Sequence, residues 1–485
     1  REKYNFCKPY GLEEKQIKDD FFFCEKLFNF FIEQLTNELN QIHNINFSVK
    51  AWKIFLGPWL KRYIRISYNR FKTLETALLS YDINKLRVGN HINYDFTTRD
   101  TDDLYSASVL PEWDYFFLSR TLKYIDHQIE NVEILNLNQK YRFTDESFKP
   151  KKKKSIAIRS LQKISQYLSF LKKNDKVFIK ESYLGTINQF ILELKLKQIP
   201  IIWQDKSIFF PCKNLNLRNR IKLSAHVNSK IYEMIRDNLP FDLPIYVVEG
   251  LTSLKKSIRY LNWPKKPQKI FTSNSFWGDE IFKYYVAENV DRGSRYIVGQ
   301  HGNSYGTRFS HDYSVEYVTC DKFLTWGQKF NEKEIVGGNF CPGIKKLNFN
   351  SKGGLLIINK GRPIRSRTYD RHHLFVDYSE DIKNLVEGLN SEIQSKTLIR
   401  NRYTIRTGEI DNSYYFSFLE KFHKIQIDKG TQPISNLIKK NKLSLFTFYS
   451  TGFLECLTNN IPTICFDKNF ISFCKQEVKK DFEIL

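Results

Sequence analysis

Two short segments hold the side chains best suited to chemistry, and each directly follows an apolar run. The first is residues 298–306, VGQHGNSYG, in which glycines surround His301. An imidazole at the carboxyl end of a strand can remove a proton from a sugar hydroxyl or donate one to a departing phosphate. A histidine hydrogen-bonded inside a tight turn is the alternative, but the flanking glycines favour an open loop shaped by Gln300, Gly302 and Gly306.

The second segment is residues 445–455, LFTFYSTGFLE, in which an apolar strand leads through small hydroxyl residues into a helix. The amides at the start of such a helix, with the hydroxyls of Ser450 and Thr451, suit a phosphate or diphosphate. Glu455 lies one turn further on, where its carboxylate can accept hydrogen bonds from ribose hydroxyls. A helix cap with Gly452 for tight packing is the alternative, although a capping box places its Glu three residues after the hydroxyl.

Arginines near the ends of the later predicted strands are candidates for a nucleotide diphosphate, because a guanidinium binds phosphate through two parallel hydrogen bonds. The basic residues in these positions are Lys360, Arg362, Arg365, Arg367, Arg400 and Arg402. Most are expected to be plain surface charge, as are Lys283 and Glu288 on the helix predicted before the His301 loop. Arg400 is preferred because it lies near the end of a strand predicted over residues 397–403.

No metal centre is expected. Asp100-Thr101-Asp102 has the D-x-D form that holds a metal-bound sugar nucleotide, but no predicted strand precedes it. His372-His373 and the eight cysteines match no metal-ligand spacing. The chain is therefore expected to need neither a metal nor another cofactor.

The charge balance is strongly basic, with 76 Lys and Arg against 53 Asp and Glu, a net charge of +23. The cations are scattered, and only residues 149–154 form a true basic run. Abundant Lys, Asn, Ile, Phe and Tyr are also what an AT-rich genome encodes, so we expect no nucleic-acid partner. A phosphorylated substrate or a peripheral contact with the anionic inner face of a membrane fits the charge.

The cell compartment follows from what the sequence lacks. No uncharged apolar stretch approaches the roughly 18 residues of a membrane-spanning helix. The cysteines show no C-x-x-C pair and suit a reducing compartment. The cytoplasm is therefore expected, with the inner membrane face as a peripheral location. Because the chain begins with Arg1 and ends soon after a predicted strand, we expect it to be trimmed at both ends.

The elements that position these residues form two α/β parts. The first 80 residues are predicted to be helical, with Asp20 as a cap and a break at Gly57-Pro58. The basic and aromatic residues 51–74 fit a helix on anionic lipid, but a helix that packs its aromatics into the core and exposes its charges to solvent is favoured. Strand–helix alternation follows, including a helix over 156–171 and a strand over 199–203.

A glycine-rich stretch at residues 331–354 marks the domain boundary. We predict an acceptor-side domain over residues 1–340, helical at its start and then α/β. We predict an incomplete α/β domain that binds the nucleotide sugar over residues 341–485.

Two α/β halves, a glycine-rich His loop and an S-T-G-x-x-E elbow resemble the GT-B glycosyltransferase plan, two Rossmann-like domains facing a cleft. More narrowly, the chain resembles a bacterial family of surface-polysaccharide transferases encoded in O-antigen gene regions. Its Gln-His-Gly loop is similar to that of capsule polysaccharide and glycerophosphate transferases. The matching stretches are residues 55–60 (FLGPWL), 68–70 (YNR), 243–250 (LPIYVVEG), 300–302 (QHG), 305–306 (YG), 323–327 (FLTWG), 450–455 and 461–464 (IPTI).

The resemblance implies transfer of a sugar, such as a nonulosonic or Kdo-like acid, from a nucleotide to a glycan or lipid-linked glycan of a cell-surface polysaccharide or lipopolysaccharide. His301 would face the reacting centre, and the elbow with Arg400 would hold the nucleotide. The family usually has more glycine where this chain has Asn303-Ser304. A sugar-nucleotide epimerase on the same architecture and a basic polyanion-binding protein without catalysis remain open alternatives.

Overall fold

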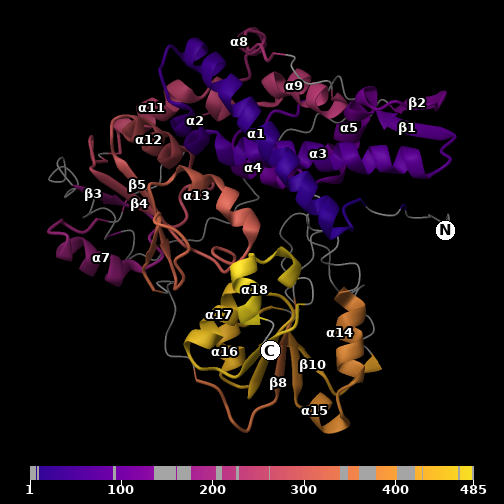
Figure 1. The fold of residues 1–485 in the computed structure, drawn as a ribbon, viewed down its shortest axis with the longest axis vertical. Coiled ribbons are helices and arrows are strands. Elements are labelled where there is room, and N and C mark those ends of the chain that lie inside the picture. The colour runs from indigo at the N-terminus through magenta and orange to yellow at the C-terminus, as the bar shows by residue number, and fades with distance from the viewer. Residues whose placement is uncertain are drawn as a thin grey trace. The chain divides into compact units, whose positions relative to one another are not determined.

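The computed structural model describes residues 7, 10–90, 94–135, 160, 176–201, 203, 210–224, 229–261, 263–338, 348–359, 378–400, 421–428, 430–467 and 470–482. The chain divides into two compact units. The first unit comprises residues 1–10, 18–300 and 313–340, and the second comprises 11–17, 301–312 and 341–485 (Figure 1). The predicted run at 149–154 and the predicted helix at 156–171 lie outside the described residues, apart from residue 160.

Helices open the first unit, as the apolar spacing predicts. They are α1 (Glu14–His43), α2 (Val49–Phe55), α3 (Gly57–Ser80), α4 (Thr101–Ala107) and α5 (Pro111–Thr121), with the short 3-10 helix η2 (Leu122–Tyr124). The predicted break is confirmed, because α2 ends at Phe55, two residues before Gly57, and Pro58 occupies the first turn of α3. Strands β1 (Lys85–Gly89) and β2 (Asn131–Leu135) form a separate parallel pair.

The prediction that Asp20 caps the first helix is wrong. The helix begins six residues earlier, at Glu14, and Asp20 lies inside it. Its carboxylate is buried and accepts hydrogen bonds from the hydroxyls of Tyr10, at 2.6 Å, and Tyr68. Asp20 therefore joins α1 to α3 and does not end a helix.

A five-stranded parallel sheet forms the α/β part of the first unit. Its strands lie in chain order: β3 (Val177–Ile179), β4 (Lys269–Thr272), β5 (Arg295–Gly299), β6 (Lys322–Thr325) and β7 (Glu334–Val336). The accompanying helices are α7 (Thr186–Lys195), α8 (Leu215–Arg218), α9 (Lys230–Asp242), α10 (Ile245–Val248), α11 (Leu251–Arg259), α12 (Glu280–Asp291) and α13 (Val315–Thr319). The 3-10 helix η5 (Phe309–Tyr313) precedes α13 in the chain, and all of it but Tyr313 belongs to the second unit. The predicted strand at 199–203 is absent from its described residues, because Gln198 and Ile201 bond to Val177 and Glu193 instead.

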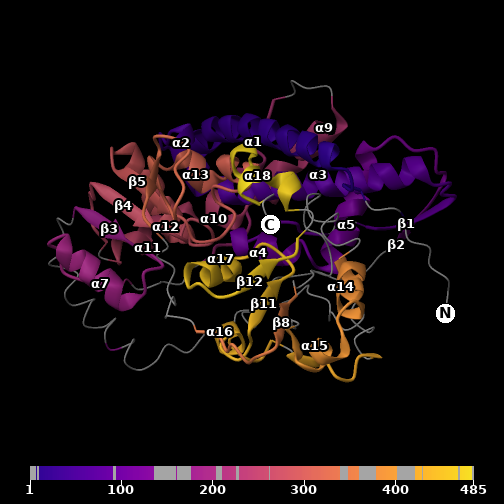
Figure 2. The same cartoon turned by 60° about the horizontal axis from the view of Figure 1, so that its bottom comes forward.

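The second unit contains another five-stranded parallel sheet, in the order β10-β9-β8-β11-β12. Its strands are β8 (Leu355–Ile358), β9 (Thr397–Arg400), β10 (Gln426–Asp428), β11 (Leu443–Phe446) and β12 (Thr463–Cys465). The chain runs outward from β8 on one side and resumes at β11 on the other, as Figure 2 shows for β8, β11 and β12. The strand order therefore reverses between β8 and β11, the place where such sheets bind ligands.

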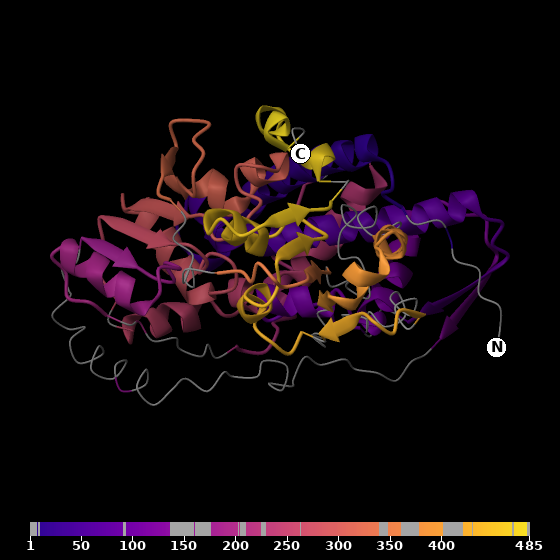
Figure 3. The ribbon, with the colours of Figure 1, turned by 90° about the horizontal axis from the view of Figure 1, so that it is seen from below.

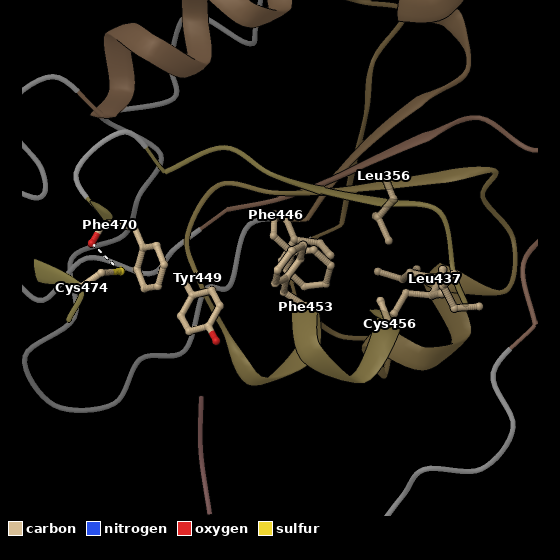
Figure 4. Packing of buried hydrophobic residues seen from close by; sticks show 11 residues of the cluster. Leu356, Leu437, Phe446, Tyr449, Phe453, Cys456, Phe470 and Cys474 are labelled. Carbon is tan, nitrogen blue, oxygen red and sulfur yellow. Dashed lines mark hydrogen bonds between the residues drawn. The ribbon is translucent and has the colours of Figure 1, made fainter. Parts of the chain in front are cut away.

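The helices of the second unit are α14 (Tyr378–Glu387), α15 (Ser391–Ser395), α16 (Ile434–Ile438), α17 (Thr451–Thr458), the 3-10 helix η8 (Ile471–Phe473) and α18 (Gln476–Phe482). Apolar side chains from β11, α16 and α17 meet on one face of the sheet (Figure 4). Phe446 and Cys456 are fully buried there, so α17 is fixed tightly against the end of β11. The strand and the following helix predicted within residues 445–455 are confirmed as β11 and α17.

In the described part of the chain, no helix combines the length and the apolar composition that a bilayer crossing requires.

Candidate functional site

The candidate site lies in the second unit, where the strand order reverses. Asn359 follows β8 and Thr447 follows β11, and both are buried. Thr447 donates to the carbonyl of Ile358 at 2.9 Å, and the hydroxyl of Tyr378 bonds to Thr447 and lies 3.4 Å from the Asn359 amide oxygen. These polar side chains close the base of the site between the two strands.

The Ser450 segment turns the chain from β11 into α17. Ser450 has extended backbone angles, and its hydroxyl accepts from the Phe453 amide at 3.3 Å. Ser450 is therefore the N-cap of α17. Its hydroxyl oxygen is occupied by this cap, as the helix-cap interpretation of the segment predicts. Thr451 and Gly452 are the first two residues of α17, and their backbone amides donate to no acceptor among the described residues. Two backbone donors thus remain available at the start of the helix, in the arrangement that binds phosphate.

Gly452 packs closely against the sheet. A Cβ built on it would lie 3.2 Å from the Phe446 ring, tighter than ordinary contact. The glycine lets the first turn of α17 approach β11, so close packing explains this position whether or not a ligand binds. Burial raises the pKa of the nearby Cys456 thiol to about 12, which rules it out as a nucleophile near neutral pH.

Glu455 lies one turn further along α17 and is half-buried. Burial raises the pKa of its carboxyl above the ordinary range. No described side chain forms a hydrogen bond or ion pair with this carboxylate. A partly buried carboxylate without a protein partner is suited to accept hydrogen bonds from a ligand.

The loop at residues 301–312 belongs to the second unit, although the sequence analysis assigned it to the first domain. The Asn303 amide donates to the Tyr449 carbonyl at 2.6 Å, one residue before the Ser450 cap. Lys475 binds the loop twice, through its amide to the Thr307 carbonyl at 2.7 Å and through its ammonium to Asp312 at 2.6 Å. The bonds of Asn303 and Lys475 explain the difference, because the loop sequence alone does not reveal its partners.

This anchoring brings the His loop beside the elbow. A Cβ built on Gly302 would lie 3.8 Å from the Thr451 hydroxyl. His301, the residue before Gly302, has its ring edge-on to the Tyr305 ring, with 5.2 Å between the ring centroids. Gly306 has a φ of 75°, a left-handed conformation that strains other residues. His301, Gly302 and Thr451 are thus brought together within one unit.

Gln300 lies at the end of β5 in the first unit. Its side chain accepts from the Trp326 amide at 2.9 Å, and its carbonyl accepts from the Trp326 indole at 3.1 Å. Gln300 therefore fixes the point from which the His loop departs. Trp326 belongs to the FLTWG stretch quoted above, so two of the matching stretches contact each other.

Arg400 ends β9, one strand away from β8, and its guanidinium lies 4.0 Å from the Asp428 carboxylate. The structure leaves its role as a phosphate ligand a prediction. The other basic candidates, Lys360, Arg362, Arg365, Arg367 and Arg402, lie outside the described residues, as do His372 and His373.

The D-x-D segment lies in the first unit, where Asp100 caps α4 by accepting from the Asp103 amide at 2.8 Å. Burial, together with the negative charges of Asp103 and Glu280, raises the pKa of Asp100 to about 7. Across the described ranges, no group of three or more His, Cys, Asp or Glu side chains is placed to hold a metal ion. Metal independence stays a prediction.

Two expectations about surface charge are wrong. Lys283, expected at the surface, is fully buried and bonds to Glu280 at 2.7 Å and Thr101 at 2.9 Å. In residues 51–74, Lys61 and Arg70 are buried and pair with Glu25 and Asp114. Burial lowers the pKa of Lys61 to about 8. These cations hold helices together, so this segment is not a lipid-binding face.

Sequence reasoning missed Asn303, Asn359 and Thr447. The last two are the first polar residues after apolar strand runs, a signal that could have identified them. Asn303 had no such signal, because only the packing of the loop shows that it binds Tyr449.

A parallel α/β sheet with its candidate site at the reversal of strand order defines a class of ligand-binding α/β proteins. Within it, residues 1–485 match the LIC12162 family transferases, and the chain belongs to that family. No curated protein matches the chain. A solved structure of S. aureus MnaA with UDP is 13% identical, covering 48% of this chain and 68% of that chain. Its TM-score of 0.28 is too low to support an argument.

Proposed function

We propose that this transferase is a glycosyltransferase that moves a sugar from a nucleotide to a cell-surface polysaccharide or lipopolysaccharide precursor. The observation that carries the proposal is the meeting of the His301 loop and the Ser450–Glu455 elbow at the strand-order reversal of the second unit. The GT-B arrangement and a nonulosonic or Kdo-like donor sugar belong to the same proposal.

The elbow is proposed to hold the nucleotide. The amides of Thr451 and Gly452 would donate to the diphosphate or phosphate, with the Thr451 hydroxyl as a third donor. The partial positive charge at the start of α17 adds to this attraction. Arg400 is proposed as a further phosphate ligand, since it ends a neighbouring strand at the same edge of the sheet.

Glu455 is proposed to accept hydrogen bonds from the ribose hydroxyls. It lies one helical turn beyond Thr451, a spacing that suits a ribose attached to a phosphate at the helix start. Hydrogen bonds from two hydroxyls would also favour its ionised form, which burial disfavours in the free protein.

His301 is proposed to act on the acceptor hydroxyl as a general base, or on the departing phosphate as a donor. The position of its neighbour Gly302 against the Thr451 hydroxyl supports an imidazole close to the proposed phosphate position. The loop bonds of Asn303 and Lys475 would hold this position during the reaction. The roles proposed for these residues involve no metal ion, and metal independence is part of the proposal.

Binding of the nucleotide is testable by thermal unfolding with CMP, CDP, UDP and GDP. A ligand at about 100 times its dissociation constant stabilises the folded state by roughly 2.7 kcal/mol. We expect one base to stabilise the chain and Glu455→Gln to abolish the shift. Glu477→Gln, an exposed carboxylate on α18 of the same unit, is the control and should keep the shift.

Failure of every nucleotide to stabilise the chain, or equal shifts in both variants, would refute the proposed nucleotide site. The stabilising nucleotide then names the donor class. Incubating that nucleotide sugar without an acceptor separates transfer from isomerisation, because only an epimerase would convert the sugar.

A further inference from the structure

Cations gather where the strands of the first unit's sheet begin. Lys176 precedes β3, Lys269 is the first residue of β4 and Arg295 is the first residue of β5, and all are exposed. The Lys269 amide donates to the Lys176 carbonyl at 2.9 Å, and Lys269 pairs with Arg295 in the sheet register. These positive charges therefore lie side by side along one edge.

The chain that enters β4 adds to this charge. Lys265 and Lys266 lie in the connecting loop and are exposed. Residues 251–278 contain no Asp or Glu, and their basic residues are Lys255, Lys256, Arg259, Lys265, Lys266 and Lys269. Among the described residues, no carboxylate forms an ion pair with any lysine of this loop or edge. The charge is thus not neutralised by the part of the protein that the structure describes.

Helix α7 lies beside β3 (Figures 1 and 3) and carries exposed apolar side chains. Ile187, Ile191 and Leu194 follow helical spacing and are 75%, 46% and 61% exposed. The polar Glu193 is instead buried, accepting from the Ile201 amide at 3.1 Å. The helix therefore turns its apolar side outward, the reverse of an ordinary surface helix.

Hydrogen bonds join this apolar side to the basic edge. The side chain of Gln198 exchanges two bonds with the backbone of Val177, at 2.8 and 2.9 Å, where β3 begins. These bonds join the start of β3, which Lys176 precedes, to the end of α7. Leu194 and the 41% exposed Leu196 lie at that end of the helix, with the exposed Lys195 and Lys197 between and beside them.

We propose that this surface, the amino edge of β3–β5 with the end of α7, docks on an anionic lipid bilayer. Lysines bind the phosphate headgroups, and the leucines and isoleucines enter the boundary with the acyl chains. A second copy of a chain with net charge +23 would place like charges together, and a nucleic acid would leave the apolar side chains unused. The inference does not rest on the proposed sugar transfer.

Docking by this edge leaves the opposite edge of the sheet unobstructed. Ligands of parallel α/β sheets bind at the carboxyl ends of the strands, whereas this surface lies at the amino ends. The first unit can therefore rest on a membrane while the carboxyl edge of its own sheet stays accessible.

The test is sedimentation of the full chain with vesicles of phosphatidylcholine alone or mixed with phosphatidylglycerol. We expect binding to the mixed vesicles only, weakened by salt. The double variant Lys265→Glu/Lys269→Glu should lower vesicle affinity by at least about tenfold, because each lysine near an anionic membrane surface contributes to the free energy of binding. Lys439→Glu/Lys440→Glu changes the net charge equally on exposed residues of the second unit and should bind like the parent.

Leu194→Gln, which removes the apolar side chain without adding charge, distinguishes a lipid surface from a general polyanion site. It should reduce vesicle binding while leaving heparin binding and the melting temperature unchanged, and Leu79→Gln, at a side chain 79% exposed elsewhere in the first unit, should change neither. The proposal is overturned if the parent does not bind vesicles that contain phosphatidylglycerol, if the two lysine variants behave alike, or if Leu194→Gln binds vesicles like the parent.

Discussion

At the scale of single residues, Glu455 is a candidate ligand-binding residue whose partly buried carboxylate destabilises the folded protein. Its carboxyl is half-buried and has a raised pKa, and no described side chain pairs with it. A residue kept in such a place at a cost to the folded state is typical of a ligand site. His301 differs, because its place depends on a loop held by other residues, chiefly Asn303 and Lys475.

Replacing Glu455 should stabilise the protein without ligand. A raised folded-state pKa means that ionising Glu455 destabilises the folded state as pH rises from the unfolded value of about 4.5 through the folded one. Glu455→Gln removes this penalty, so its melting temperature should exceed that of the parent near about pH 7.5 and match it near about pH 4. Equal melting temperatures at both pH values would contradict the raised pKa.

Replacing His301 should affect turnover and not nucleotide binding. General acid–base catalysis contributes about 10² to 10⁴ in rate, so His301→Ala should lower kcat by at least about 10². The dissociation constant of the nucleotide should stay within about twofold, since the elbow is unchanged.

His311→Ala is the control, because this histidine lies in the same loop with its ring against Tyr305. A similar loss of turnover in both variants would indicate loop damage and not chemistry at His301. Loss of nucleotide affinity in His301→Ala, or full activity, would exclude the assigned role.

At the scale of elements, buried polar contacts between helices hold the first unit together. Asp20 joins α1 to α3, and the fully buried Arg218 and Glu249 pair at 2.7 Å near α8 and α10. His43 ends α1 and bonds to the backbone of Val247 in α10. Such contacts need a defined protonation state, which makes the packing of the helices sensitive to acid.

Acid should weaken the contact between α1 and α10. Burial lowers the pKa of His43 from 6.5 to about 4, so its neutral form stabilises the fold above pH 6.5 and this stability is lost as pH falls towards 4. The shift corresponds to up to about 3 kcal/mol.

His43→Gln should reduce the loss of stability between neutral and acid pH, measured by urea unfolding. His127→Gln, at an exposed residue of the same unit, should leave it unchanged. Identical pH dependence in the parent and in His43→Gln would show that His43 is not the group responsible.

At the scale of the whole molecule, the net charge of +23 separates into two populations. Lys61, Arg70, Lys283 and Arg218 are buried in ion pairs and act within the fold. Lys265, Lys266 and Lys269 are exposed beside apolar side chains and are available to an anionic partner. Composition cannot separate these populations, because charge counts are the same whether a side chain is buried or exposed.

The elements of the second unit could be read from the sequence because their signals are local. The apolar runs that became β8, β11 and β12, and the hydroxyl residues that begin α17, each predict one element without reference to the rest of the chain. Predictions that required a partner were less successful. Asp20 was expected to cap a helix and Lys283 to face solvent, but each is buried against residues far along the chain.

The α/β class, the strand that leads into the elbow and the two loops with candidate chemistry are predictable from the sequence alone. The position of the His loop in the unit that holds the elbow, through Asn303 and Tyr449, and the reversal of strand order between β8 and β11 are visible only in the folded protein. Helix and strand signals arise within a few neighbouring residues, whereas strand order and loop anchoring depend on contacts between residues far apart in the chain, such as Leu355 with Leu443 and Asn303 with Tyr449.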